Sequence, residues 1–88
     1  MYKINILKKA QSDLDWFRRN DKNSYIKCFD LVREVMVKPR EGTGKPERFK
    51  YFEKEVFSRR INYKDRLIYT IYEEFEEIDI TSFRGHYE

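Results

Sequence analysis

The sequence has little cysteine, histidine, glycine or proline, and it has no long hydrophobic run. One cysteine (Cys28) excludes an intrachain disulfide, and one cysteine with one histidine (His86) excludes a zinc site of the Cys/His kind. No apolar run approaches the ~18 residues that span a bilayer. The N-terminus also lacks the hydrophobic stretch and small-residue cleavage site of a secretory signal. We therefore expect a reduced, cytoplasmic protein without a membrane segment.

Charged and aromatic residues are abundant instead. Charged residues make up 40% of the chain, and the mean hydropathy is −0.91, which alone would be compatible with disorder. However, 17% of the residues are aromatic, and disordered chains are poor in aromatics. With 88 residues, the chain is expected to form one small domain over residues 1–88, with an aromatic-rich core.

The charge is unevenly distributed along the chain. Net charge is +3 over residues 1–37, +5 over residues 38–66 and −5 over residues 67–88. The basic middle segment (residues 38–66) contains Lys38, Arg40, Lys45, Arg48, Lys50, Lys54, Arg59, Arg60, Lys64 and Arg66. Aromatic residues are interleaved with these cations, a mixture that suits RNA phosphates and unstacked bases. A solvated cationic sheet face over an aromatic core explains the same composition equally well.

The first half of the chain has a strand pattern followed by two helix patterns. Alternation over residues 2–7 predicts a strand, and a helix is predicted over about residues 9–20. The second helix is expected to be capped by Asn23 or Ser24 and to end before Pro39. Its expected apolar stripe consists of Ile26, Phe29, Val32, Val35 and Met36.

The second half has a strand pattern. Alternation predicts strands over residues 56–63, 66–72 and 77–83, and a further short strand near residues 49–52 is an option. The connections are short and polar, so antiparallel hairpins are expected. The predicted fold is α+β, with order β-α-α-β-β-β and two N-terminal helices on one face of an antiparallel sheet.

The segment Gly42-Thr43-Gly44-Lys45 superficially resembles a phosphate-binding loop. The Walker pattern requires four residues between its glycines and a preceding strand, whereas here a helix precedes. The segment is better interpreted as a mobile turn that presents Lys45 and Glu47.

Three residues have the chemistry for metal-free RNA cleavage, namely Glu47, Arg66 and His86. The reaction needs a base for the ribose 2′-OH, an acid for the 5′-oxygen and cations for the phosphoryl oxygens. Histidine has the unperturbed pKa nearest neutrality. Arg59 and Arg60 are neighbours on a strand, so only one of them can face a given site. From spacing alone, a lone terminal histidine is more often a solvated surface residue, Glu47 is by default a surface charge, and Arg66 is explained as well by an ordinary cation at a strand end.

Four sequence blocks together resemble the YoeB/Txe family of bacterial toxins, which belongs to the RelE superfamily. They are Gly42-x-Gly44-Lys45-Pro46-Glu47, Phe57-Ser58-Arg59-Arg60-Ile61, Asp65-Arg66-Leu67-Ile68-Tyr69 and Arg84-x-His86-Tyr87. The resemblance also covers chain length and element order, so it implies a RelE-like fold over nearly the whole chain.

The resemblance implies a type II toxin that cleaves mRNA on the ribosome as an endoribonuclease, without a cofactor or metal, together with a cognate antitoxin. A homodimer is also left open. It implies Glu47 as general base, His86 as general acid, Arg66 as the arginine that stabilises the transition state, and Tyr87 as an orienting residue. Expected RNA- or phosphate-binding residues are Lys45, Lys50, Arg59, Arg60 and Arg84.

Two departures from the family pattern lie near these blocks. Residues 53–57 keep an aromatic before the Ser-Arg-Arg block but lack the usual glycine, and Gly85 replaces a bulkier residue before His86. Two other functions remain as alternatives. One is a non-catalytic ParE-like toxin that acts on a protein target such as DNA gyrase, and the other is a plain RNA-binding module. Codon preference and the identity of the antitoxin do not follow from the sequence.

Overall fold

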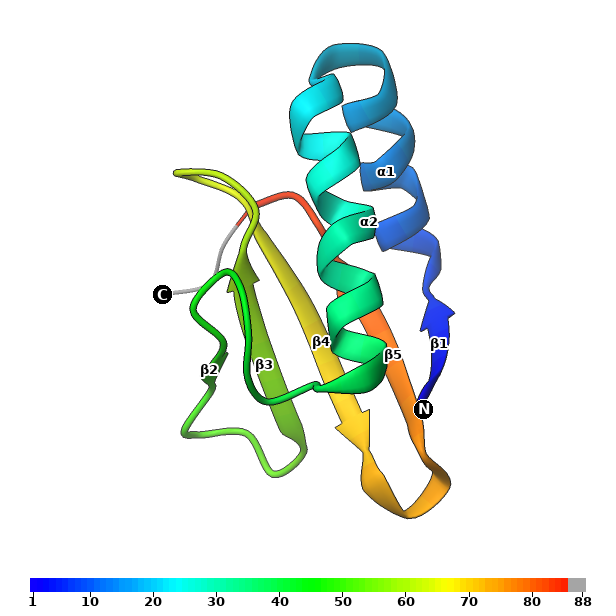
Figure 1. Cartoon of the computed structure of the whole chain (residues 1–88), viewed down its shortest axis with the longest axis vertical. Coiled ribbons are helices and arrows are strands. Elements are labelled where there is room, and N and C mark those ends of the chain that lie inside the picture. Colours follow the sequence, from blue (N-terminus) through cyan, green and yellow to red (C-terminus); the bar gives the residue numbers. More distant parts are fainter. Residues whose placement is uncertain (86–88) are drawn as a thin grey trace.

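The computed structural model describes residues 1–85, and it shows two helices packed on one side of a five-stranded sheet (Figure 1). The elements are β1 (Lys3–Ile6), α1 (Lys8–Asn20), α2 (Lys22–Val37), β2 (Glu47–Arg48), β3 (Glu55–Arg60), β4 (Arg66–Tyr72), the 3-10 turn η1 (Glu73–Phe75) and β5 (Glu77–Ser82). The α+β class and the helix pair are thus confirmed. Within the described residues, no helix is both long and apolar enough to cross a membrane.

The sheet is mixed, and this corrects the expectation that all its strands are antiparallel. Strand order is β1-β5-β4-β3-β2, and β1 pairs with β5 in parallel while the other pairs are antiparallel. A parallel pair needs a long crossover connection. Here the helices and the hairpins lie between the two strands in sequence, so local hairpin signals do not specify this pairing.

Helix α1 buries Ala10, Leu14 and Phe17 in the core, whereas α2 differs from expectation in its cap and in its buried face. The cap is Asp21, whose carboxylate accepts hydrogen bonds from the Ser24 amide at 3.1 Å and the Ser24 hydroxyl at 2.7 Å. The buried residues of α2 are Ser24, Cys28, Leu31 and Val35. Ile26 and Phe29, which were expected inside, are 58% and 38% exposed. A series spaced by three residues drifts about 60° around the helix at each step, so it does not stay on one face.

The three long strands form where they were predicted, with small shifts at their ends. The fifth strand is β2 (Glu47–Arg48), slightly before the range considered for it, and it pairs with Phe57 and Ser58 in the middle of β3. Strand β3 ends at Arg60, because the following turn is closed by the Asn62 side-chain oxygen, which accepts from the Lys64 and Asp65 amides.

One sheet face forms the core beneath the helices. Phe57, Leu67, Tyr69, Ile71, Ile78 and Ile80 belong to the same buried cluster as Leu14, Phe17, Leu31 and Val35. Cys28 lies in this cluster and is fully buried, and burial raises the pKa of its thiol to about 12. The thiol therefore stays protonated at neutral pH, and Cys28 packs in the core as a small hydrophobic residue.

Candidate active site

The strand register brings the predicted base and two cations onto the sheet face opposite the helices. Glu47 of β2 lies opposite Ser58 of β3, and Arg60 of β3 lies opposite Arg66 of β4. Directly opposed residues share a face, as do residues two apart on one strand. Glu47, Arg60 and Arg66 therefore all lie on the face opposite the one that carries Phe57 and Leu67.

The spacing within this set leaves room for a substrate group. Glu47 on β2 and Arg66 on β4 are separated by β3, and their partners on β3, Ser58 and Arg60, are two residues apart. This offset corresponds to about 12 Å between the Glu47 and Arg66 Cα atoms. Glu47 and Arg60 are exposed, and Arg66 is half-buried. Long side chains can approach a phosphate from both sides across such a gap.

The turn that precedes Glu47 is fixed against the body of the protein. The Gly44 carbonyl accepts from the Arg60 amide at 2.7 Å, and the Thr43 amide donates to the Glu34 carboxylate at 2.8 Å. Gly44 has a φ of +87°, and a Cβ there would lie 3.0 Å from the Arg60 carbonyl oxygen. A side chain at this position would strain the backbone and would crowd the Arg60 carbonyl, so both features favour glycine.

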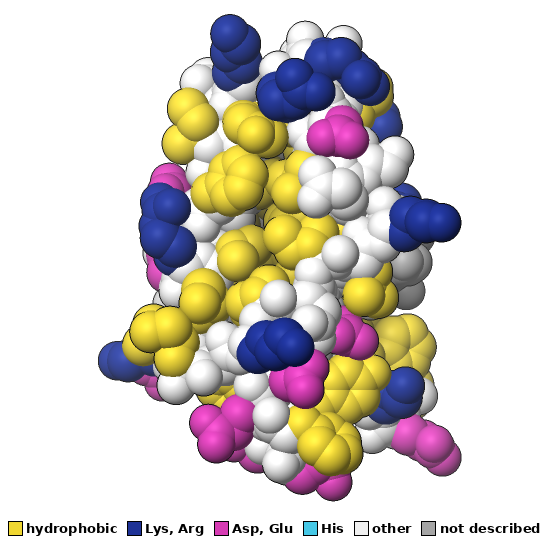
Figure 2. Space-filling model, turned by 90° about the vertical axis from the view of Figure 1, so that its right-hand side faces the viewer, with side chains coloured by type: hydrophobic (Ala, Val, Ile, Leu, Met, Phe, Trp, Pro, Cys, Tyr) yellow, Lys and Arg dark blue, Asp and Glu magenta, His cyan; other side chains and the backbone are white. Residues whose placement is uncertain are grey.

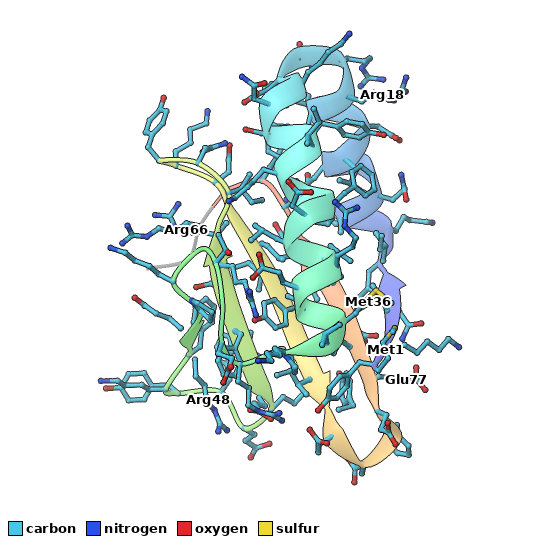
Figure 3. All side chains as sticks on the ribbon, in the orientation of Figure 1. Met1, Arg18, Met36, Arg48, Arg66 and Glu77 are labelled. Carbon is cyan, nitrogen blue, oxygen red and sulfur yellow. The ribbon has the colours of Figure 1, made fainter. Side chains whose placement is uncertain are left out.

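Arg66 lies where the described chain ends. Its amide donates to the Gly85 carbonyl at 2.9 Å, and its Nη1 donates to the Asn62 and Asp65 carbonyls at 2.9 and 3.0 Å. Figure 3 shows Arg66 on the β2 side of the molecule, away from the helices. His86 and Tyr87, the predicted acid and orienting residue, lie outside the described residues.

Arg59 is a structural residue, and its predicted contact with RNA phosphate is wrong for this structure. Its side chain is fully buried and points beneath the helices, whereas Arg60 is exposed on the other face. The Arg59 guanidinium donates to the Tyr69 hydroxyl, to the Glu34 carboxylate and to three carbonyls in the loop after α2. The prediction that the two arginines diverge is confirmed, but strand alternation does not tell which one turns inward.

Arg84 contacts a helix. Its guanidinium carbon lies 3.7 Å from the centre of the Trp16 ring, an arrangement that is favourable for a cation over an indole face. The other predicted phosphate ligands, Lys45 and Lys50, are exposed. Arg48, which sequence reasoning did not single out, is exposed next to Glu47, and only its place in the basic middle segment pointed to it.

The basic middle segment carries less free positive charge than its composition suggests. Arg40 forms ion pairs with Glu55 and Glu73 at 2.6 and 2.8 Å. The hydrogen bonds that Arg40 donates to these two carboxylates raise the pKa of Arg40, and the one donated to Glu55 lowers the pKa of Glu55. Within residues 1–85, no ion pair neutralises Lys45, Lys50, Arg60 or Arg66. Two of these cations, Arg60 and Arg66, share the sheet face of Glu47.

A second surface feature is apolar. Figure 2 shows hydrophobic side chains gathered in a band along the face that carries β1 and α1, with Lys and Arg side chains at its margins. Exposed hydrophobic residues on β1, on its connection to α1 and on α2 include Ile6, Leu7 and Phe29. Phe17 of α1, in contrast, is fully buried and does not contribute to this surface.

Comparison with known proteins identifies the family. The model of the YoeB-like toxins of bacterial type II toxin–antitoxin systems matches residues 7–87. The YoeB toxin of Synechocystis is 36% identical over 86 residues, covering 98% of each chain. Among solved structures, the YoeB dimer from Staphylococcus aureus is 34% identical, with a TM-score of 0.85 and 98% of each chain covered.

Another solved structure contains both partners of such a system. It is the heterotetrameric YoeB–YefM toxin–antitoxin complex of Staphylococcus aureus, in which the matched chain is 34% identical, with a TM-score of 0.81 and 99% of each chain covered. The agreement in sequence and in fold extends over essentially the whole chain. The protein therefore belongs to the YoeB-like toxins of bacterial type II toxin–antitoxin systems.

Proposed function

We propose that this toxin is a ribosome-dependent endoribonuclease that cleaves mRNA through attack of a ribose 2′-OH on the neighbouring phosphate. The observation that carries the proposal is the placement of Glu47, Arg60 and Arg66 on one open sheet face, with Gly85 hydrogen-bonded to the Arg66 backbone. The residue next to the family's terminal His-Tyr pair thus lies beside the arginine that the chemistry needs.

Each side chain has a defined role in this reaction. Glu47 removes the 2′-OH proton, and the resulting oxygen attacks phosphorus to form a 2′,3′-cyclic phosphate. His86 protonates the 5′-oxygen as the P–O bond breaks, and Tyr87 orients the substrate. Arg66 stabilises the charge that develops on the phosphoryl oxygens. Arg60, Lys45 and Lys50 hold neighbouring phosphates.

The exposure of the site supports dependence on the ribosome. Glu47 and Arg60 are open to solvent, so these side chains do not by themselves enclose or orient a flexible RNA strand. Orienting the reacting groups supplies a large share of the barrier reduction in such a reaction. A second surface that holds the mRNA in place, as a translating ribosome does in the cytoplasm, would supply this orientation.

The antitoxin and a second toxin copy are the other proposed partners. An acidic or amphipathic antitoxin segment that folds on binding suits the cations on the sheet face of Glu47. Exposed hydrophobic residues such as Ile6, Leu7 and Phe29 are candidate apolar anchors for it. The Staphylococcus aureus relatives are described as a dimer and as a YoeB–YefM complex, which supports both assemblies here.

The test is cleavage of a defined mRNA on programmed ribosomes, mapped by primer extension. Glu47→Gln and His86→Ala are expected to cleave about 10²- to 10⁴-fold more slowly, because each removes a proton-transfer group. Glu53→Gln is the matched control, since it makes the same change at an exposed position in the following loop.

Three results would contradict the proposal. Cleavage by His86→Ala at the wild-type rate would show that His86 is not the general acid. A wild-type protein that leaves ribosome-bound mRNA intact but inhibits DNA gyrase would favour the ParE-like alternative. Binding of RNA without any cleavage would favour an RNA-binding module.

A further inference from the structure

We infer that Asp13 and Asp65 are positioning residues that clamp the backbone of residues 83–85 and so fix the point from which the His86–Tyr87 end begins. This inference rests on the proposed function, because it concerns the placement of the proposed general acid. Asp13 comes from α1 and Asp65 from the turn between β3 and β4, and neither has a role in the chemistry described above.

Three successive backbone amides beyond the end of β5 are all bound by these two carboxylates. Asp13 Oδ2 accepts from the Phe83 amide at 2.9 Å and from the Arg84 amide at 3.0 Å. Asp65 Oδ1 accepts from the Gly85 amide at 2.9 Å. The Gly85 carbonyl in turn accepts from the Arg66 amide, so the last described residue is held on both of its backbone polar groups.

Both carboxylates are buried, at 5% exposure for Asp13 and 3% for Asp65. Burying a carboxylate is unfavourable unless it is paired and hydrogen-bonded. Lys9 Nζ lies 2.7 Å from Asp13 Oδ2, and Asn62 Nδ2 donates to Asp65 Oδ2 at 3.0 Å. Each carboxylate therefore has a partner within the body of the fold in addition to the tail amides that it binds.

Closing the fold does not by itself require this arrangement. Phe83 is fully buried in the core cluster, and apolar packing of that ring already anchors the end of β5. Chain ends fray unless they are tied down, and bonds from amides to ionised carboxylates are stronger than neutral ones. An error of about 1 Å in the position of a reacting group can reduce a rate by about 10²-fold, so a fixed tail has a direct catalytic value.

Two further contacts restrain the same segment. Lys9 Nζ donates to the Arg84 carbonyl at 3.1 Å, and the Arg84 guanidinium lies over Trp16. Arg84, predicted from the sequence to bind phosphate, thus joins the tail to α1.

The decisive comparison uses three variants in the programmed-ribosome assay, namely Asp65→Ala, Asp65→Asn and Glu55→Ala. Asp65→Ala is expected to lower kcat by about 10- to 10²-fold with KM changed less than about threefold. Asp65→Asn keeps an oxygen able to accept from the Gly85 amide but turns its NH2 group toward Asn62 Nδ2, so it should recover part of the rate that Asp65→Ala loses. Glu55→Ala is the matched control, because it removes one partly buried carboxylate of the Arg40 ion pair, which lies near η1 at the other end of the sheet.

A wild-type kcat for Asp65→Ala would overturn the inference, and so would an equal loss of rate in Glu55→Ala. A second measurement needs no variant and no cleavage. The Arg84 and Gly85 amides of the wild-type protein should exchange with deuterium at least about 10-fold more slowly than the amides of exposed loops. If these amides exchange as fast as exposed loops, the inference is wrong even if the protein cleaves mRNA. If they are protected but the protein does not cleave mRNA, only the proposed function is wrong.

Discussion

Arg59 and Tyr69 form a buried polar pair between the sheet and the loop after α2. Arg59 Nε donates to the Tyr69 hydroxyl at 3.1 Å, and that hydroxyl donates to the Pro39 carbonyl at 2.5 Å. The same guanidinium reaches the Lys38, Glu41 and Thr43 carbonyls. One side chain therefore ties the segment that leads to Glu47 onto β3, which links the stability of the fold to the geometry of the site.

Replacing Arg59 should break the hydrogen bonds that hold the loop after α2 on β3 and so destabilise the fold. Arg59→Ala is expected to lower the free energy of unfolding by about 3–5 kcal/mol, because it opens a cavity and leaves buried acceptors without donors. Arg60→Ala, one residue along on the exposed face, should change it by less than about 0.5 kcal/mol. Chemical denaturation of both variants measures the difference, and equal effects would contradict the structural role of Arg59.

Ribosome binding should weaken as salt increases, because contacts between cations and phosphates release counterions. Cosedimentation with ribosomes across a salt series should give a negative slope of log binding constant against log salt. Arg60→Ala should reduce the magnitude of that slope by about 1, in line with the loss of one phosphate contact.

Lys3→Ala is the matched control for the salt series, because it removes an exposed cation on β1, the opposite edge strand of the sheet. Binding that does not depend on salt would indicate a hydrophobic target instead.

The ion pair between Arg40 and Glu55 should make stability depend on pH in the acid range. The Glu55 pKa is lowered in the folded state, chiefly by the hydrogen bond from Arg40. The contribution of the pair is therefore fully present above the unfolded pKa of about 4.3 and is lost as pH falls through the lower folded pKa.

Glu55→Gln should lower the free energy of unfolding by up to about 1 kcal/mol at pH 7, a small effect because the Arg40 side chain is partly exposed. Below the folded pKa of Glu55 the wild-type carboxyl is protonated too, so the two proteins should then be equally stable. Urea titrations of both proteins between pH 7 and the acid limit measure this convergence. A constant difference at all pH values would show that the effect is one of packing and not of charge.

The antitoxin should protect two surfaces at once. Hydrogen exchange is expected to be slower in the complex than in free toxin at two places. One is the exposed amides of residues 45–50, which include Glu47, and the other is β1 with its connection to α1. Occlusion of the cations around Glu47 and anchoring on the apolar band account for the two regions. Protection confined to residues 73–77 would contradict this mode of inhibition.

The order of the elements, the α+β class and the divergence of Arg59 and Arg60 were all accessible from the sequence, because each follows from local periodicity. The family resemblance was accessible as well, because its four blocks are contiguous in sequence. The predicted apolar stripe of α2 was only partly right, because Val35 is buried as expected whereas Ile26 and Phe29 are exposed. Spacing fixes which residues lie together on a helix only to within a turn, and contact with the sheet decides which of them are buried.

The tertiary structure alone decided the rest. The parallel pairing of β1 with β5 joins segments more than 70 residues apart, and no local signal encodes it. Which arginine of the pair turns inward depends on the face that the helices cover, and that in turn depends on the whole sheet. The roles of Asp13 and Asp65 arise in the same way, because an isolated aspartate looks like a surface charge until folding brings three tail amides to two buried carboxylates.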